Sequence, residues 1–383
     1  MIVLNLVELS TSRHTATAFS AAIFFVALIL FVWFRLIPLR HNRDILTNDF
    51  VQMYLTGKAV AAGVPVYEPL PDLAARFDPR LNDDNHPSAY PPAFALLGAF
   101  VSRSAYEKSF MLWGDFEILC FVATVLLLFQ RFREVGPGIF IIATLMLMWW
   151  PLYVDLFQGQ VMMLALLLLT GSWLLLRTRH EFCAGVLLGV LFSLKLYGLP
   201  ILIFLLIIKK GWPVLAALLT FIVINLVAIY VVGLDQALFY AQRVVPSIAR
   251  IYHGHPLNFS LFALFGPIAA FLVFTVVMFL ATRSDLDVGF MLSLVIASVL
   301  SPVAWIHYLV TLLPAACLLV DRNRKEPLRL LPLVILAMVV APDAEIYKMF
   351  GVRWWPLTLV FGLLIYLGLA SHGRKAVAAV QRV

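Results

Sequence analysis

The chain has 383 residues, of which 63% are hydrophobic and only 13% are charged. A soluble domain carries about 25% charged residues, so this composition excludes an ordinary soluble protein and indicates a lipid bilayer. The apolar runs are continuous rather than alternating, so they predict membrane-spanning helices. The net charge of +7 does not indicate a nucleic-acid partner, because most Lys and Arg stand at the ends of apolar runs, where they set orientation in the membrane.

The whole chain, 1–383, is predicted to form a single all-α polytopic membrane domain of about twelve spans. The first span, roughly 17–37, is expected to stay as an anchor, because it is too long for a signal-peptide core and no small-residue cleavage site follows it. The others are expected at roughly 109–130, 137–153, 160–176, 182–196, 198–208, 212–232, 266–282, 288–304, 306–320, 328–342 and 355–371. The segments 182–196 and 198–208 are short for a crossing and are interpreted as a broken hairpin.

The distribution of basic residues predicts that both termini are cytoplasmic. With that orientation most Lys and Arg of the short connections lie inside, and outside the long first loop the opposite face holds only Lys195, Arg243, Arg250, Lys348 and Arg353. Four polar pieces then lie on the outer face, namely 39–108, 156–160, 235–258 and 343–354. The inner connections are too short for a nucleotide-binding domain, and neither a Walker sequence nor a G-x-G-x-x-G motif occurs.

The long loop 39–108 is expected to carry juxtamembrane helices. Its stretch "LTNDFVQMYLTGKAVAAGVPVYEP" predicts an amphipathic surface helix that is capped by Thr47 or Asn48, takes Asp49 in its first turn and ends at Gly63. Asp49 is interpreted either as a carboxylate that complements the helix dipole or as a functional acid. The ten apolar residues 92–101 are too few to span and predict a re-entrant or interfacial helix. The pair Asp83–Asp84 is interpreted as a solvated turn.

Two polar groups interrupt the following apolar runs. Gln158 and Gln160 flank Gly159 at the outer end of a span, where their amides could bind hydroxyl or phosphate oxygens or could cap the next helix. Lys195 lies late in a short apolar helix. A lysine at depth costs roughly 2.5–3.5 kcal/mol, so it either snorkels or faces a polar cavity, and we favour a cation for an anionic lipid head group.

Histidines lie near the outer ends of later segments. His307 and Tyr308 follow a proline turn, so His307 is expected to line the same outer cavity, although a lone histidine there is often only interfacial. His253 and His255 precede Asn258 with no carboxylate close by, so a zinc site is not expected.

Six short patterns follow one another along the chain. They are "NDF…Y…G…G…VY" from residue 48, "YPPAFALL" from 90, "GQ" at 159, "AGVLLGVLFSLKLYGLP" from 184, "LNFSL" from 257 and "SPVAWIHY" from 301. Over about residues 45–315 this order resembles glycosyltransferase family 87, whose members are polytopic enzymes of the GT-C type that use a polyprenyl-phosphate sugar, typically mannose. The chain departs from the family pattern at Met162, Phe259 and Tyr308, which leaves the identity of the sugar open.

The resemblance implies an inverting transfer at the extracytoplasmic face of the plasma (inner) membrane. Asp49 matches the acid that acts as general base, and Lys195 and His307 match residues that face the donor phosphate. The sugar and acceptor pocket would be lined by Asn48, Tyr90, Gln158, Gln160, Asn258 and Tyr308. The expected partners are the polyprenyl-phosphate sugar donor, a lipid-linked or cell-envelope glycan acceptor and membrane lipids. No metal and no cofactor is expected, because the donor is itself the activated substrate.

Two other classes of protein remain as alternatives. A transporter or flippase would explain many spans, a broken helix and a buried lysine, but transporters concentrate polar residues at mid-membrane and no repeat relates the two halves of this chain. A scaffold protein would leave the gathering of polar residues at one face unexplained.

Overall fold

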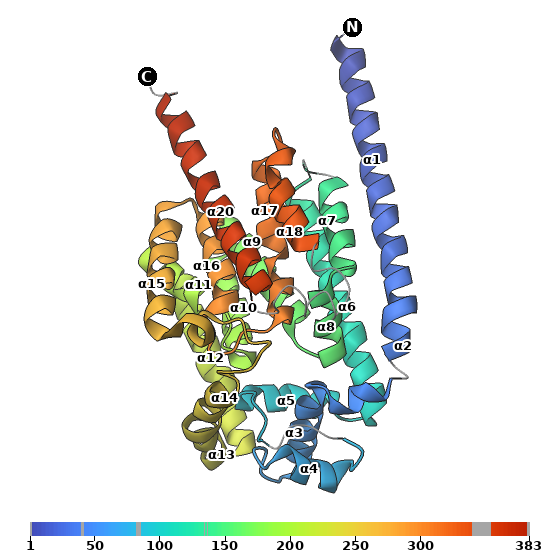
Figure 1. Cartoon of the computed structure of the whole chain (residues 1–383), viewed down its shortest axis with the longest axis vertical. Helices are drawn as coiled ribbons and strands as arrows, with labels where there is room; N and C mark the ends of the chain where they lie inside the picture. The colour runs from blue at the N-terminus through green and yellow to red at the C-terminus, as the bar shows by residue number, and fades with distance from the viewer. Residues whose placement is uncertain are drawn as a thin grey trace.

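The computed structural model describes residues 2–39, 42–81, 86–133, 135, 137–338 and 354–380, and every regular element in these ranges is a helix. This confirms the predicted all-α class. In Figure 1 both termini lie at the upper end of the elongated molecule, and a group of short helices lies at the lower end. The two ends of the chain therefore share one side of the bundle.

Within the described ranges, four helices are long and apolar enough to cross a membrane. They are α1 (Ile2–Phe31) with its continuation through η1 (Val32–Leu36) and α2 (Ile37–Leu39), α6 (Tyr106–Arg131), α12 (Gly211–Val232) and α15 (Leu261–Arg283). A fifth span is counted if α7 (Pro137–Leu147) and α8 (Trp150–Gln158) are taken together, although the pair is bent by 58°. Within α15, Gly266 has non-helical backbone angles and separates a first short piece from the rest.

Helices occur in all twelve predicted segments, but several are too short for a full crossing at a rise of 1.5 Å per residue. The shorter ones are α9 (Met162–Arg177), α10 (Glu181–Leu194), α11 (Leu199–Ile207), α16 (Leu286–Leu300), and η4 (Ile306–Leu312) with α17 (Leu313–Arg322). The last helices are η5 (Pro327–Leu330), α18 (Leu331–Met338) and α20 (Trp354–Val380), and α18 and α20 border residues outside the described ranges. Twelve crossings are therefore not confirmed. The outer segment predicted at 343–354 (except Trp354) and the pair Asp83–Asp84 lie outside the described residues.

The short helices at the lower end of Figure 1 form what we call the cap: α3 (Phe50–Ala62), α4 (Leu70–Phe77), α5 (Pro92–Val101), α13 (Leu234–Phe239), η3 (Tyr240–Val244) and α14 (Val245–Ile251). α5 starts at the predicted Pro92, as the missing N–H of proline allows. A second apolar core, separate from that of the bundle, holds the cap together around Phe50, Leu55, Leu70 and Trp113.

Tyr67 joins the loop after α3 to the later cap helices. Its ring stacks on that of Tyr240 at 5.3 Å, its N–H donates to Gln236 Oε1 (3.1 Å), and its hydroxyl donates to the carbonyl of Tyr90 (2.9 Å). Burial raises the pKa of Tyr240 to about 12 and raises that of Tyr67 as well, so both phenols stay neutral. Segments far apart in the sequence are thereby fixed over one end of the bundle.

The prediction that α3 is an amphipathic surface helix is wrong. The helix ends at Gly63 in the left-handed conformation as expected, but most of its residues are buried, including the polar Gln52 and Thr56. The cause is close packing: an added Cβ at Gly57 would lie 2.2 Å from the backbone of Gly98 in α5, so the two helices are almost in backbone contact. α3 is an inner element of the cap.

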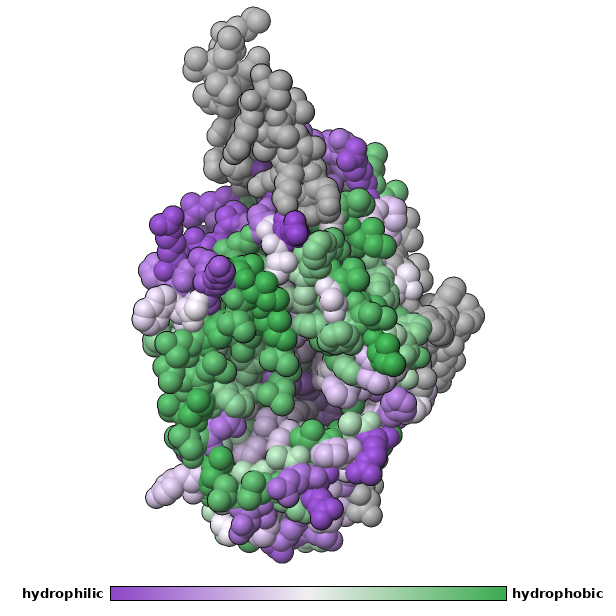
Figure 2. Space-filling model, turned by 90° about the vertical axis from the view of Figure 1, so that its left-hand side faces the viewer, coloured by the Kyte–Doolittle hydropathy of each residue, from purple (hydrophilic) through white to green (hydrophobic). Residues whose placement is uncertain are grey.

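The surface has the pattern expected of a protein in a bilayer. Figure 2 shows a hydrophobic band between two hydrophilic ends. The band includes α12 and α15, whose apolar windows are only 17% and 22% buried inside the protein. At the lower edge of the band the face shown in Figure 2 is hollowed, with hydrophilic residues at the bottom of the hollow. α16, by contrast, is buried along nearly its whole length and lies at the centre of the bundle.

Candidate functional site

Asp49 lies where α3 begins, between the cap and the bundle. It is the residue that precedes the helix, yet its side chain makes no capping hydrogen bond to the helix backbone. Its half-buried carboxylate instead accepts from two side-chain amides, at 2.5 Å from Gln160 Nε2 and 3.4 Å from Gln52 Nε2. Capping of α3 therefore does not account for this acid.

Asn48 holds the backbone on which Asp49 sits. Its Oδ1 accepts from the N–H of Phe50 (3.1 Å) and from the hydroxyl of Tyr106 (2.8 Å), and its Nδ2 donates to the carbonyl of Phe157 (2.7 Å). Asn48 is buried, and these bonds tie the start of α3 to α6 and α8. It caps α3 as predicted, and its place in a sugar pocket stays a prediction.

The two glutamines reach Asp49 from a tight turn between α8 and α9. Gly159 takes the left-handed conformation (φ 61°), and the N–H groups of Gly159 and Gln160 both reach the carbonyl of Asp155. Trp113 Nε1 donates to the carbonyls of Gly159 (3.1 Å) and Gln160 (3.0 Å). Gln158 Oε1 accepts from the N–H of Asp49 (3.1 Å). The alternative that Gln160 caps the next helix is not supported, since α9 starts at Met162 without a side-chain cap.

Lys195 lies on the other side of Gln160 from Asp49. The chain leaves α10 at Lys195 in extended conformation, and α11 starts after Gly198, so the predicted break is present, while the hairpin stays a prediction. Lys195 Nζ donates to Gln160 Oε1 (3.1 Å) and lies 4.4 Å from the centre of the Tyr308 ring, a cation–π contact. Gln160 therefore bridges an acid and a cation by its two amide ends (its NH₂ to Asp49, its oxygen to Lys195).

His307 and Tyr308 belong to η4 and are buried beside this bridge. Their rings are 5.0 Å apart, and Lys195 is close enough to His307 to interact with it electrostatically. Among the described residues His307 Nε2 has no hydrogen-bond partner. A buried ring nitrogen without a partner is unfavourable, so it is available to a group that enters the site.

Tyr90 and Asn258 contact other groups of the protein. Tyr90 stacks on Phe94 with ring centres 4.0 Å apart, and the neighbouring Ala89 N–H donates to Gln52 Oε1. The amide of Asn258 is fully used by backbone groups, with its Nδ2 on the carbonyls of Tyr252 and Pro302 and its Oδ1 on the N–H groups of Ser260 and Ala304. These bonds favour a structural role for Asn258, and a pocket role for either residue stays a prediction.

Sequence reasoning missed three residues that the structure adds to this region. Gln52 contacts Asp49, and two carboxylates, Glu117 of α6 and Asp155 of α8, are completely buried beneath the glutamine turn. Glu117 Oε2 accepts from the N–H groups of Met163 (2.9 Å) and Leu164 (3.3 Å) at the start of α9. An acid inside an apolar run, as in "FEILCF" and "YVDLF", is the signal that could have found the carboxylates.

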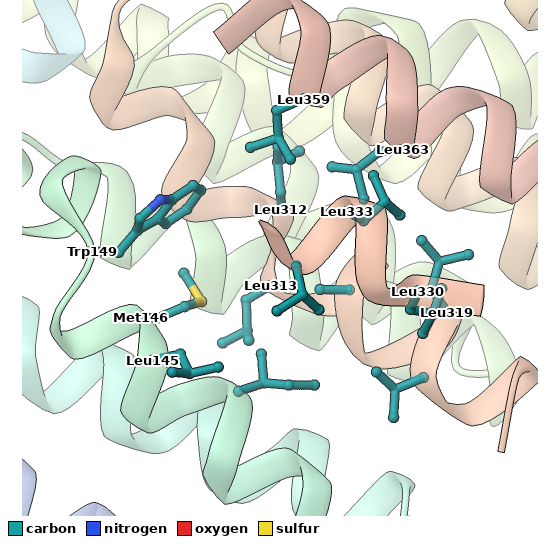
Figure 3. Close-up of a pocket in the computed structure, with 14 residues that line it drawn as sticks. Leu145, Met146, Trp149, Leu312, Leu313, Leu319, Leu330, Leu333, Leu359 and Leu363 are labelled. Carbon is teal, nitrogen blue, oxygen red and sulfur yellow. The ribbon is translucent and has the colours of Figure 1, made fainter. Parts of the chain in front are cut away.

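A cavity of about 160 Å³ lies apart from this site, between α7, α17, α18 and α20. Figure 3 shows that its lining is apolar apart from the indole N–H of Trp149, with leucines from α17, α18 and α20 opposite Leu145 and Met146. None of the predicted site residues lines it, so we place the functional site at the acid–amide–cation bridge.

The fold and the site define a class: an α-helical membrane protein with an acid and a cation joined under a polar cap at one end of the bundle. The sequence model of glycosyltransferase family 87 matches residues 89–342, and the chain belongs to this family. No curated protein and no solved structure matches the chain. The protein is thus a membrane glycosyltransferase, which favours this class over the transporter alternative.

The matched range covers only part of the site. It includes the site residues from position 90 onward, which are Tyr90, Gln158, Gln160, Lys195, Asn258, His307 and Tyr308. Asn48 and Asp49 lie before it. The assignment of Asp49 as a catalytic residue therefore depends on its contacts with Gln160 and Gln158, not on the family match.

Proposed function

We propose that the protein transfers a sugar, with mannose the first candidate, from a polyprenyl-phosphate donor to a hydroxyl group of a lipid-linked or cell-envelope glycan. The observation that carries the proposal is the bridge from Asp49 through Gln160 to Lys195. A carboxylate and an ammonium group contact the two ends of one amide, and this supports a displacement in which the carboxylate takes a proton from a hydroxyl nucleophile and the cation faces a phosphate leaving group.

The chemistry assigns one role to each side of the bridge. The acceptor oxygen attacks the anomeric carbon while its proton passes to the Asp49 carboxylate, and the bond from the anomeric carbon to the phosphate oxygen breaks with inversion. Negative charge grows on the departing polyprenyl phosphate, where Lys195 and the Nε2 of His307 can stabilise it. The electron pair of the broken bond stays on the phosphate, so no oxidant or reductant is needed.

The surface supports a donor that stays in the bilayer. The hollow in Figure 2 lies where the hydrophobic band meets the hydrophilic cap end, which suits a lipid with an apolar tail and a charged head. Within the described part of the chain no group of three His, Cys, Asp or Glu side chains is arranged to hold a metal ion. We expect Lys195 and His307 to serve the phosphate, and turnover without a divalent ion stays a prediction.

A transfer assay tests the proposal. The purified full-length protein, in liposomes that contain an extract of envelope lipids and glycans, is given radiolabelled polyprenyl-phosphate mannose. We expect label in the acceptor fraction and release of free polyprenyl phosphate in equal amount. Transfer from a nucleotide sugar in place of the lipid-linked donor would overturn the donor assignment, and failure with mannose but success with another lipid-linked sugar would correct only the sugar.

The orientation gives a separate prediction. In a Cys183→Ser background the remaining cysteines, Cys120 and Cys317, are buried, so a single new exposed cysteine can be labelled selectively. We expect a membrane-impermeant maleimide to label Asp235→Cys in the cap from outside the cell and His180→Cys, between α9 and α10, only after the cells are opened. The reverse pattern would place the site on the cytoplasmic face.

A further inference from the structure

Asn258 is a buried residue whose side-chain amide is used entirely by the protein itself. The residue is 0% exposed. Its Nδ2 donates to the carbonyls of Tyr252 (2.9 Å) and Pro302 (3.2 Å), and its Oδ1 accepts from the N–H groups of Ser260 (3.0 Å) and Ala304 (3.0 Å). An asparagine amide has two N–H donors and two acceptor lone pairs, so this amide has no group left for a sugar or a phosphate.

The amide holds the segment 301–305, which leads from α16 to η4 and forms no helix. Two further hydrogen bonds reach the same segment. The carbonyl of Pro302 also accepts from Ser260 Oγ (3.0 Å), and the carbonyl of Ala304 accepts from the N–H of Phe259 (3.2 Å). The connection into η4 is therefore fixed by a short stretch of chain that immediately precedes α15.

η4 depends on such contacts for its position. A 3₁₀ helix of seven residues is unusually long, and its hydrogen bonds have poorer geometry than those of an α-helix. Late in η4 the hydroxyl of Thr311 lies 2.6 Å from that of Tyr197, which holds this part of the helix. At the other end the fixed segment 301–305 sets where η4 begins, and His307 is the second residue of the helix.

We propose that Asn258 is a positioning residue for His307, whose ring it places, through the backbone of residues 302–304, for contact with the donor phosphate. This inference rests on the proposed function, which assigns the phosphate to Lys195 and His307. The His307 ring lies 5.0 Å from that of Tyr308, and Lys195 Nζ lies 4.4 Å from the centre of the same Tyr308 ring. A donor or cation stabilises a developing charge only when it is held in the productive geometry, so a shift at the start of η4 should weaken this contact.

A double-mutant cycle tests this role, with a short-chain polyprenyl phosphate as the probe and its dissociation constant for the full-length protein in detergent as the readout. His307→Ala should raise the dissociation constant about 10- to 100-fold, as expected for loss of a hydrogen bond to a charged group. Asn258→Asp has nearly the same shape but cannot replace both N–H donors, so it should raise the constant about three- to tenfold. In the His307→Ala background it should have no further effect, within about twofold, because Asn258 acts only through His307.

Two other variants separate positioning from a loss of stability. Ser172→Ala removes a buried hydroxyl that donates to the carbonyl of Ala184 (3.0 Å), and it lies about 15 Å along α9 from the end that carries the glutamine turn. It should lower the melting temperature and leave probe binding unchanged. Ser260→Ala is a milder change in the held segment, because it removes one bond to the Pro302 carbonyl and the cap of α15. It should raise the dissociation constant about threefold, and only when His307 is present, even if Asn258→Asp does not fold.

The outcomes separate this role from the proposed function. A wild-type protein that does not bind polyprenyl phosphate would overturn the proposed function. If the wild type and His307→Ala bind the probe equally well, the phosphate contact of His307 is absent and the positioning role of Asn258 falls with it, while the donor class stands. If His307→Ala weakens binding but Asn258→Asp and Ser260→Ala do not, or if their effects simply multiply with that of His307→Ala, the positioning role alone is overturned.

Discussion

Replacing Asp49 with asparagine should lower the rate of sugar transfer about 10²- to 10⁴-fold, the usual contribution of a positioned general base. The substitution removes the carboxylate that accepts from Gln160 Nε2 and nearly preserves the shape of the side chain. Transfer is measured with the lipid-linked donor at saturating acceptor, so that the loss appears in kcat. Donor binding should change little, because the phosphate is held on the Lys195 side.

The fold should tolerate this change because the Asp49 carboxylate does not cap α3 and bonds to side-chain amides. The matched control is Asp44→Asn, five residues earlier on an exposed turn that contacts neither glutamine. It should retain wild-type transfer. Near-normal turnover in the Asp49 variant, with both variants equally well folded, would show that another group is the base.

Much of the site could be predicted because the chain marks it with polar residues in apolar surroundings. Asp49, Gln158, Gln160 and Lys195 come from three separate stretches of the sequence, and the structure brings all four residues into one chain of hydrogen bonds. The reason is the arrangement of helix ends. Each of these residues stands where a helix begins, ends or breaks, and the connections on one face of the bundle must lie close together.

Other features could not be read from the chain. Glu117 and Asp155 are marked in the sequence as acids inside apolar runs, but the groups that they meet appear only when α6 and α8 are seen to converge on the start of α9. The sequence of α3 predicts a surface helix, because its glutamine, threonine and lysine suggest a solvent-exposed face. The close approach of Gly57 to Gly98 buries that face against α5, and such a contact depends on tertiary packing rather than on local pattern. The predicted number of crossings is not confirmed, since apolar segments can pack in a bundle without spanning it.

The turn that carries the glutamines is the second place where one substitution should have a large effect. Gly159→Ala should destabilise the protein by about 2 to 4 kcal/mol and lower transfer about tenfold to hundredfold. Two causes add. The residue has φ 61°, which an L side chain adopts only at a cost, and its Cβ would lie 2.6 Å from the Cβ of Phe50, the residue after Asp49. Relief of this clash must move Phe50 or the turn, and either shift misplaces Asp49 against Gln158 and Gln160.

Gly63→Ala provides the matched control for the conformational part of this effect. Gly63 ends α3 with nearly the same angle, φ 66°, but an added Cβ would meet no atom within 4 Å. Gly63→Ala should therefore lower the free energy of unfolding by only about 1 kcal/mol, which is the cost of the left-handed conformation for alanine. It should keep full transfer activity. We expect the melting temperature to be highest for the wild type, lower for Gly63→Ala and lowest for Gly159→Ala. Only Gly159→Ala should lose transfer activity. Equal melting temperatures and equal activities for the two alanine variants would show that the contact of Gly159 with Phe50 does not position the acid, because that contact is the structural difference between the two turns.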